Sequence, residues 1–296
     1  MSGISKVLGF GLPFSPQQSS CSIKTPKNFR WTIDQRDKSC ELEVWVDQSI
    51  LIGLNHNRVC EKKVAWICES SHIVPNVVKY IDENMDYVLS NYDFVFTCDK
   101  TLTQRDNPRV IYCPPGSNTS WISQDKQLIY DKTKLCSIIA SNKKITHGHM
   151  LRHQIADTYK ESIDLYGGVA GSPKIGMGNL VNSWHDKSEG LKDYMFSFAI
   201  ENSSYETYYT EKIMDCFTTG TVPIYWGSPD IGDHFNKDGI IIWDDKFNID
   251  ILSEEMYYDM IPAIKENYEL ATSTKIADDI LYELVENNCY EPSNEH

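Results

Sequence analysis

The sequence lacks a run of apolar residues long enough to cross a lipid bilayer. The apolar stretch near its start, Val7-Leu8-Gly9-Phe10-Gly11-Leu12, is short and broken by glycine. A membrane-spanning helix needs about 20 consecutive apolar residues, and a secretory signal needs an unbroken apolar centre. We therefore expect no membrane span, no secretory signal and a cytoplasmic location.

Basic residues are also scarce. The chain has 28 Lys and Arg against 42 Asp and Glu, which gives a formal net charge of −14. Because nucleic acids are bound through a basic surface that neutralises phosphates, this balance predicts no nucleic-acid partner. A smaller anionic ligand can still bind wherever a few basic residues gather locally.

The nine cysteines form no Cys-x-x-Cys pair, and their number is odd. Several lie inside apolar runs, as in Ile67-Cys68 and Phe96-Thr97-Cys98. This pattern is unlike a disulfide framework or a zinc site, which use paired cysteines at regular spacing. We expect reduced, buried thiols that pack as small apolar side chains.

What the chain does contain is enough apolar residue, 41% of 296 positions, for two ordinary domains. Eight short segments are apolar on consecutive positions and rich in β-branched or aromatic residues, which is typical of strands covered on both faces. These predicted strands are 64–68, 94–98, 110–113, 135–140, 163–166, 195–200, 222–226 and 240–243. Segment 43–51 is a further candidate.

Helical patterns alternate with these strands. Apolar residues recur on one helical face over 77–89, and residues 150–160 and 210–219 form two more helices. Two closing amphipathic helices are expected over 256–264 and 276–285. The alternation predicts a parallel α/β architecture.

A turn-rich and then polar connector over 114–134 divides the chain. We expect an N-terminal domain, residues 1–125, and a C-terminal domain, residues 126–296, whose last helices can pack back on the first domain. Ligands bind in clefts between such domains and at the carboxyl ends of parallel strands.

Residues 195–226 form the most informative stretch, which reads as a strand, a polar loop, a helix and a second strand. Thr210 is a plausible N-cap for the helix, and Gly220 is placed to end it. The loop therefore enters a helix N-terminus, where backbone N–H groups bind anions such as a diphosphate, and Lys212 adds a full positive charge. The alternative is a surface unit whose charged residues are only solvated.

Three pieces of this stretch resemble the signature of the α-1,3/1,4-fucosyltransferases, glycosyltransferase family 10, above all its bacterial members. They are Phe198-Ala-Ile-Glu-Asn-Ser203, Tyr208-Tyr-Thr-Glu-Lys212 and Val222-Pro-Ile-Tyr-Trp-Gly227. The resemblance implies the GT-B fold, in which two Rossmann-like domains face each other across a cleft. It also implies GDP-fucose as the donor, inversion of the anomeric centre, and donor contacts by Asn202, Tyr208, Glu211 and Lys212.

Two further residues acquire a role from the same resemblance. Arg152 matches the arginine that binds the diphosphate in the family, a task that suits its planar set of N–H donors. Val64-Ala-Trp-Ile-Cys-Glu-Ser-Ser-His72 is similar to the Trp-Met-Asn-x-Glu-Ser-Pro segment of the animal members, which makes Glu69 the proposed general base; Ser71 stands where those members have proline. The alternatives are an exposed arginine at a helix start and a glutamate that caps a loop.

Other patterns carry less information. Gly176-Met-Gly178 is an incomplete dinucleotide fingerprint, and segment 173–178 is better interpreted as a loop beside the donor cleft. The histidines 147, 149 and 153 are expected to be partly solvated rather than metal ligands. No Asp-x-Asp triplet ends a strand. We therefore expect no catalytic metal and no required cofactor, with a divalent cation stimulating at most.

The resulting hypothesis is an inverting transferase that moves L-fucose from GDP-fucose to a hydroxyl of a glycan acceptor. Its partners would be the GDP-sugar and the glycan. Two alternatives stay open: the same fold and mechanism with another GDP-linked sugar, or a non-catalytic module that binds nucleotide sugars or glycans.

Overall fold

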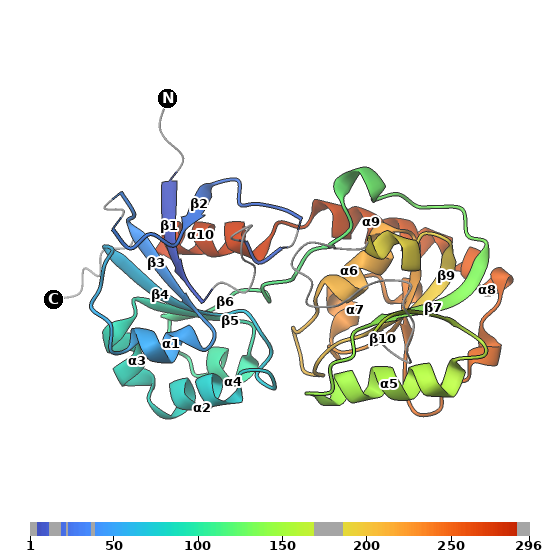
Figure 1. Ribbon diagram of the computed structural model, residues 1–296, viewed down its shortest axis with the longest axis horizontal. Coiled ribbons are helices and arrows are strands. Elements are labelled where there is room, and N and C mark those ends of the chain that lie inside the picture. The colour runs from blue at the N-terminus through green and yellow to red at the C-terminus, as the bar shows by residue number, and fades with distance from the viewer. Residues whose placement is uncertain (1–4, 12–18, 22, 37–38, 169–185, 289–296) are drawn as a thin grey trace. The chain divides into compact units, whose positions relative to one another are not determined.

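The computed structural model describes residues 5–11, 19–21, 23–36, 39–168 and 186–288. The chain divides into two compact units (Figure 1). The first consists of Met1–Asn118 together with Lys275–His296, and the second is Thr119–Thr274. The chain therefore leaves the first unit near residue 118 and returns to it near residue 275.

The first unit is built on a six-stranded sheet in the order β2-β1-β3-β4-β5-β6, and every neighbouring pair is parallel. All five residues of β3 are buried, as expected for a strand with helices on both faces. The strands are β1 (Ser5–Phe10), β2 (Phe29–Thr32), β3 (Leu42–Val46), β4 (Lys62–Ile67), β5 (Phe94–Thr97) and β6 (Val110–Tyr112).

Helices cover the two faces of this sheet differently. One group of helices consists of α1 (Ser49–Gly53), α2 (Pro75–Glu83), α3 (Met85–Asn91) and α4 (Lys100–Thr103). Helix α10 (Ala277–Asn288) lies apart from this group (Figure 1). Trp45 and Ala65 pack in one apolar cluster with residues of α1–α4, whereas Val44 and Trp66 pack in another with residues of α10. Successive strand residues thus face opposite layers.

Buried carboxylates attach α10 to the first unit. Asp278 accepts hydrogen bonds from the backbone N–H of Ser20 at 3.1 Å and from the indole N–H of Trp31 at 2.7 Å, and burial raises its pKa. Asp279 accepts from the backbone N–H of Lys27 at 2.8 Å. These hydrogen bonds replace the ones that the two carboxylates would otherwise make with water.

The second unit has a five-stranded parallel sheet in the order β11-β10-β9-β7-β8. Its strands are β7 (Lys134–Ala140), β8 (Asp164–Gly167), β9 (Tyr194–Ile200), β10 (Val222–Trp226) and β11 (Ile241–Ile242). The α-helices are α5 (His147–Tyr159), α6 (Glu211–Thr218), α7 (Ile231–His234), α8 (Glu254–Asp259) and α9 (Ile261–Ser273). Short 3-10 turns are η1 (Gln124–Lys126), η3 (Lys187–Gly190), η4 (Lys237–Gly239) and η5 (Ile249–Ile251).

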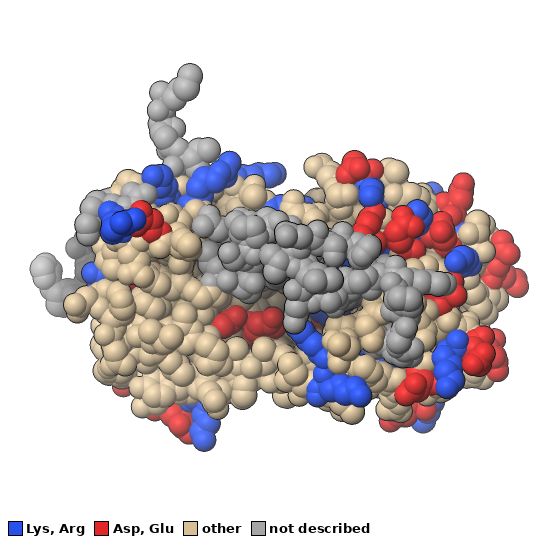
Figure 2. All heavy atoms as spheres, viewed as in Figure 1, with Lys and Arg blue, Asp and Glu red and all other residues tan. Residues whose placement is uncertain are grey.

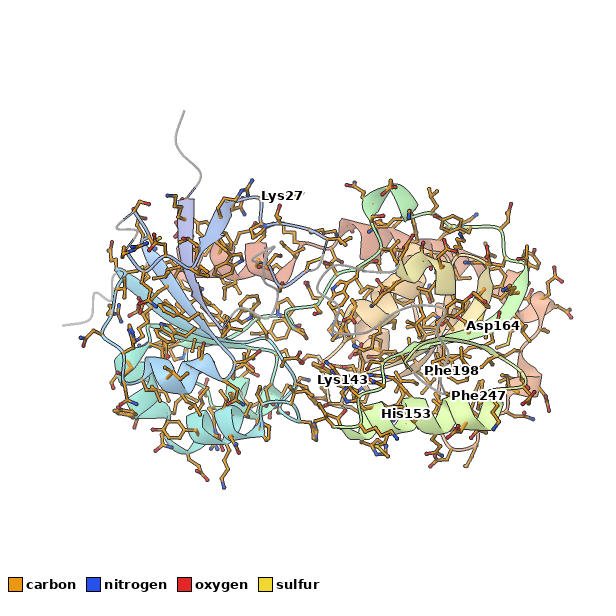
Figure 3. The ribbon with its side chains drawn as sticks, viewed as in Figure 1. Lys27, Lys143, His153, Asp164, Phe198 and Phe247 are labelled. Atoms are coloured by element: carbon orange, nitrogen blue, oxygen red, sulfur yellow. The ribbon has the colours of Figure 1, made fainter. Side chains whose placement is uncertain are left out.

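The fully buried strand β9 separates two helical layers. On one face Phe198 stacks on Tyr159 of α5, with ring centroids 5.9 Å apart, and meets Phe247 edge-on at 5.7 Å (Figure 3). On the other face Ala199 packs in a cluster with Ile213 and other residues of α6. As a result α5 and α6 cover opposite faces of the sheet.

All eight predicted strands are present, and the α/β class with two Rossmann-like units is confirmed. Strands β1 and β2 were not predicted, because their apolar runs are short and polar residues flank them. Segment 43–51 is strand only as far as Val46 and then turns into α1.

Two segments that were each predicted to form one helix form two helices instead. The 77–89 pattern is two helices, α2 and α3, because Asn84 leaves the helical conformation between them. The first tail pattern is also two helices, α8 and α9. Pro262 lies in the first turn of α9, where its missing N–H costs no hydrogen bond.

The eight cysteines within the described ranges are all buried thiols, as expected. Among the described helices, none combines the length and apolar character that a bilayer crossing requires. Acidic side chains are exposed around α8 in Figure 2, where Glu254, Glu255 and Asp259 lie at the surface.

The packing of α10 predicts a large effect of shortening its apolar face. Leu281→Ala should lower the free energy of unfolding by about 2–5 kcal/mol, because Leu281 is only 1% exposed within the first unit's core. Leu270→Ala on α9 is the matched control, since Leu270 is 45% exposed and should change stability by less than about 0.5 kcal/mol. Urea unfolding measures both, and equal effects would contradict this packing.

Candidate active site

A pocket opens in the second unit at the carboxyl ends of β7 and β9. It is lined by residues of β7, β9, α5, α6 and η3. Five of its lining residues have charged side chains: Arg152, Lys187, Glu211, Lys212 and Asp215. This edge of a parallel sheet is where α/β proteins bind ligands.

The buried carboxylate of Glu201 connects the end of β9 to the start of α6. One of its oxygens accepts from the backbone N–H of Thr210 and the other from the Thr210 hydroxyl, both at 2.7 Å, while Lys212 Nζ lies 3.2 Å from Oε2. Thr210 is the N-cap residue as predicted, but its side chain makes no capping bond because its hydroxyl serves Glu201. Glu201 is therefore a structural member of the site that sequence reasoning counted only as a loop residue.

Arg152 is buried on α5 and faces the same loop. Its Nε donates to the Ile200 carbonyl at 2.8 Å, and a terminal nitrogen donates to the Asn202 side-chain oxygen at 2.7 Å. Burial lowers its pKa, which the charges of Glu201 and Glu211 oppose. Gly148 permits this approach, since a Cβ there would lie 1.8 Å from the Glu201 carbonyl oxygen.

The first turn of α6 carries a chain of charges. Lys212 Nζ donates to the Thr210 hydroxyl oxygen at 2.8 Å and to Glu211 Oε1 at 3.4 Å, and Lys187 Nζ lies 3.4 Å from the same Glu211 oxygen. Burial would raise the pKa of Glu211, but Lys212 and Lys187 outweigh it and hold that pKa at about 2. Glu211 is therefore a carboxylate across the physiological range.

The structure thus brings Arg152, Asn202, Glu211 and Lys212 together around one loop and one helix start. Tyr208 lies differently: it is 1% exposed and stacks on Tyr205, with ring centroids 4.9 Å apart. It does not line the pocket in this conformation.

Histidines 147, 149 and 153, which were predicted to be partly solvated, lie in α5, and each contacts a different partner. His149 completes a capping box with Thr146, and burial together with the Arg152 charge lowers its pKa to about 4. His153 Nε2 lies 3.2 Å from the Lys143 carbonyl oxygen (Figure 3), and the His147 ring lies against Trp226. His149 is buried rather than solvated, which corrects that expectation: the capping box requires its ring inside the turn.

Glu69 lies in the first unit, two residues beyond the end of β4. Its backbone N–H donates to Asp47 Oδ1 at 3.2 Å, and that of Cys68 donates to the same oxygen at 2.9 Å. Asp47 follows β3, the parallel neighbour of β4, so two adjacent strands each end in a carboxylate. Sequence reasoning missed Asp47, although an acid directly after an apolar strand was a readable signal. The predicted loop 173–178 lies outside the described residues.

Asp47 is in an unfavourable environment. Its φ of 50° is rare for a residue with a side chain, and burial together with the Glu69 charge raises its pKa to about 7. Because the folded-state pKa exceeds the unfolded value near 3.8, folding is favoured most at low pH, and this contribution disappears as the pH rises towards 7.

Asp47→Asn should therefore stabilise the protein above pH 7 and have little effect near pH 4. Asparagine keeps the oxygen that accepts the two N–H groups and removes the charge. We expect a gain of about 2 kcal/mol at pH 8, which is less than the full shift allows because the side chain is half-buried. Urea unfolding at pH 4.5 and 8 measures this; a gain that does not depend on pH would contradict it.

Comparison with known proteins finds a family similarity within the second unit. Residues 129–259 match the family model described as glycosyltransferase family 10 (fucosyltransferase), C-terminal. An alpha-(1,3)-fucosyltransferase of Helicobacter pylori is 33% identical over 119 residues, 40% of this chain and 23% of that protein. An alpha-(1,4)-fucosyltransferase of Arabidopsis thaliana is 34% identical over 64 residues, 21% of this chain and 16% of that protein. The chain thus spans less than a quarter of these relatives' length.

One crystal structure, of an alpha1,3-fucosyltransferase, resembles the whole chain. It covers 100% of this chain and 93% of its own length, with a TM-score of 0.53 and 18% sequence identity. At this identity the likeness shows the fold, which is the expected GT-B class of two parallel α/β units. Residues 129–259 of this chain are thus similar to the C-terminal part of glycosyltransferase family 10, the fucosyltransferases.

Proposed function

We propose that this protein transfers L-fucose from GDP-fucose to a hydroxyl group of a glycan acceptor, with inversion at the anomeric carbon. The observation that carries the proposal is the pocket of the second unit, where Arg152, Lys212 and the α6 N-terminus converge within the family-10 segment. In the proposal, the second unit binds the donor and the first unit binds the acceptor.

The donor side supplies positive charge for the leaving diphosphate. The Arg152 guanidinium has five N–H donors. Its Nε donates to the Ile200 carbonyl and one terminal nitrogen donates to the Asn202 side chain, so further N–H groups can donate to a phosphate. Lys212 is 21% exposed and can turn an N–H towards a phosphate oxygen. The N-terminal amides of α6 add the positive end of the helix dipole. These groups stabilise the negative charge that develops on GDP as it leaves.

The acceptor side supplies the base. Glu69 removes the proton of the acceptor hydroxyl as its oxygen attacks the anomeric carbon. The bond from that carbon to the β-phosphate oxygen breaks, and its electron pair leaves with GDP. The products are the fucosylated acceptor, GDP and protonated Glu69. We propose that the reaction requires no metal and takes place in the cytoplasm.

Turnover of GDP-fucose tests the proposal. The protein is incubated with GDP-fucose and acceptors that contain galactose or N-acetylglucosamine, with and without EDTA, and GDP release is measured. Proton NMR of the product reports the anomeric configuration, and competition among GDP-sugars reports donor choice. A folded protein that turns over none of the GDP-sugars would refute the function, and if it still bound both donor and glycan it would be a binding module.

Glu69→Gln should lower transfer at least about 100-fold, because glutamine has nearly the same shape but cannot accept the proton. Its affinity for GDP, measured by calorimetry, should match that of the unmodified protein. A fully active variant would place the base elsewhere.

Arg152→Lys should weaken GDP binding by about 10- to 100-fold, because lysine keeps the charge but loses the planar pair of donors. Arg105→Lys is the matched control, since Arg105 is exposed in the first unit and contacts Asp82. Calorimetry with GDP measures both variants, and thermal unfolding confirms that they are folded. If the two variants bound GDP with equal affinity, Arg152 would not be part of the donor site.

A further inference from the structure

Lys187, the first residue of η3, is a buried lysine of the pocket that the family signature does not include. Its Nζ lies 2.8 Å from Asp215 Oδ2 and 3.4 Å from Glu211 Oε1, and its side chain is 12% exposed. The ammonium also lies over the Trp121 ring, 4.5 Å from the ring centroid. Its partners therefore reach it from α6 and from the segment that precedes η1.

The two carboxylates it contacts stand four residues apart on one face of α6. Like charges at this spacing repel each other, and burial strengthens the effect. A single cation between them removes that repulsion. Burial alone would lower the pKa of Lys187, but Asp215 and Glu211 raise it, so the lysine stays charged.

Asp215 and Glu211 are held to different extents. Asp215 also accepts from the Ser120 hydroxyl at 2.8 Å and from the Trp121 backbone N–H at 2.6 Å, so its position is determined by the framework. Glu211 has Lys187 and Lys212 as its cationic partners and reaches the pocket. Asp215 thus orients Lys187, and Lys187 orients Glu211.

We propose that Lys187 is a positioning residue that holds the Glu211 carboxylate ionised and directed into the pocket, where it accepts hydrogen bonds from ring hydroxyls of the nucleotide sugar. A carboxylate repels phosphate oxygens and attracts hydroxyls, so Glu211 marks the hydroxyl-binding part of a site whose other cations bind phosphate. Lys187 itself is unsuited to a phosphate, because two carboxylates already neutralise it. The inference rests on the proposed function of the pocket.

Lys187→Met tests this role. Methionine keeps most of the length of the side chain and removes the ammonium together with its charge. Affinity is measured by calorimetry for three probes: inorganic pyrophosphate, GDP and GDP-fucose. We expect pyrophosphate binding to stay within about twofold and GDP-fucose binding to weaken about tenfold or more, as for the loss of one hydrogen bond to a charged group. A loss shared by GDP assigns the hydroxyls to ribose, and a loss confined to GDP-fucose assigns them to fucose.

The pH dependence separates positioning from a merely structural role. The charged groups around Glu211 are Lys187 on η3, Lys212 and Asp215 on α6, and Arg152 on α5. Without Lys187, Lys212 alone of the two lysines opposes the burial of Glu211, so the pKa of Glu211 should rise from about 2. GDP-fucose affinity should then fall as the pH is lowered from 7 to 4.5 in Lys187→Met, whereas the unmodified protein should show a flat profile.

Two further variants make the test robust. Lys187→Arg keeps the cation and should restore affinity to within about threefold. Lys192→Met, a more exposed lysine just beyond η3 that contacts Glu189, is the matched control and should behave as the unmodified protein. If Lys187→Met fails to fold, Asp215→Asn replaces it, because asparagine can still accept from Trp121 while it releases Lys187.

The outcomes distinguish the two proposals. If the unmodified protein binds neither pyrophosphate nor GDP, the proposed function fails. If it binds them and Lys187→Met matches it for all three probes at every pH, the positioning role is overturned while the function stands. A loss of pyrophosphate affinity would also overturn it, because Lys187 would then be a direct phosphate ligand.

Discussion

The buried carboxylate of Glu201 is the constraint on which the pocket depends. It accepts two hydrogen bonds from Thr210 and lies beside Lys212, so the end of β9 and the start of α6 are held together. Its carbonyl oxygen lies where only a residue without a side chain, Gly148, lets α5 approach. One strand end and two helix starts therefore share one pocket, and Arg152 reaches the loop from α5. If Glu201 were neutral, Lys212 would lose one of its two buried counter-charges.

The charges of the site are arranged as alternating neighbours. Lys212 lies between Glu201 and Glu211, and Lys187 lies between Glu211 and Asp215. The basic residues are therefore held in place before a ligand enters, which lowers the cost of ordering them. The proposed function requires a chain with a net charge of −14 to bind an anion, and it relies on these locally held basic residues. Local positive charge, rather than the overall balance, decides binding at short range.

Most of the fold could be predicted from the sequence because buried parallel strands have a simple signature. All eight predicted strands exist, whereas β1 and β2 have runs too short to stand out. The residues proposed for the donor site in the loop and α6 could be chosen from the sequence because they lie within one short motif. Lys187 was missed for a physical reason: its carboxylate partners lie on α6, far along the chain, and no residue next to Lys187 indicates them. His149 was placed in solvent because a capping box of Thr and His is unusual.

The sequence by itself determined the α/β class, the run of strands and the segment that resembles family 10. These follow from local periodicity and from residues close together in the chain. Only the tertiary structure decided that α10 completes the first unit, that Thr210 serves Glu201 instead of capping its helix, and that Lys187 lies between two carboxylates. Such choices depend on which buried polar groups can satisfy each other once water is excluded. That competition takes place between residues far apart in the chain.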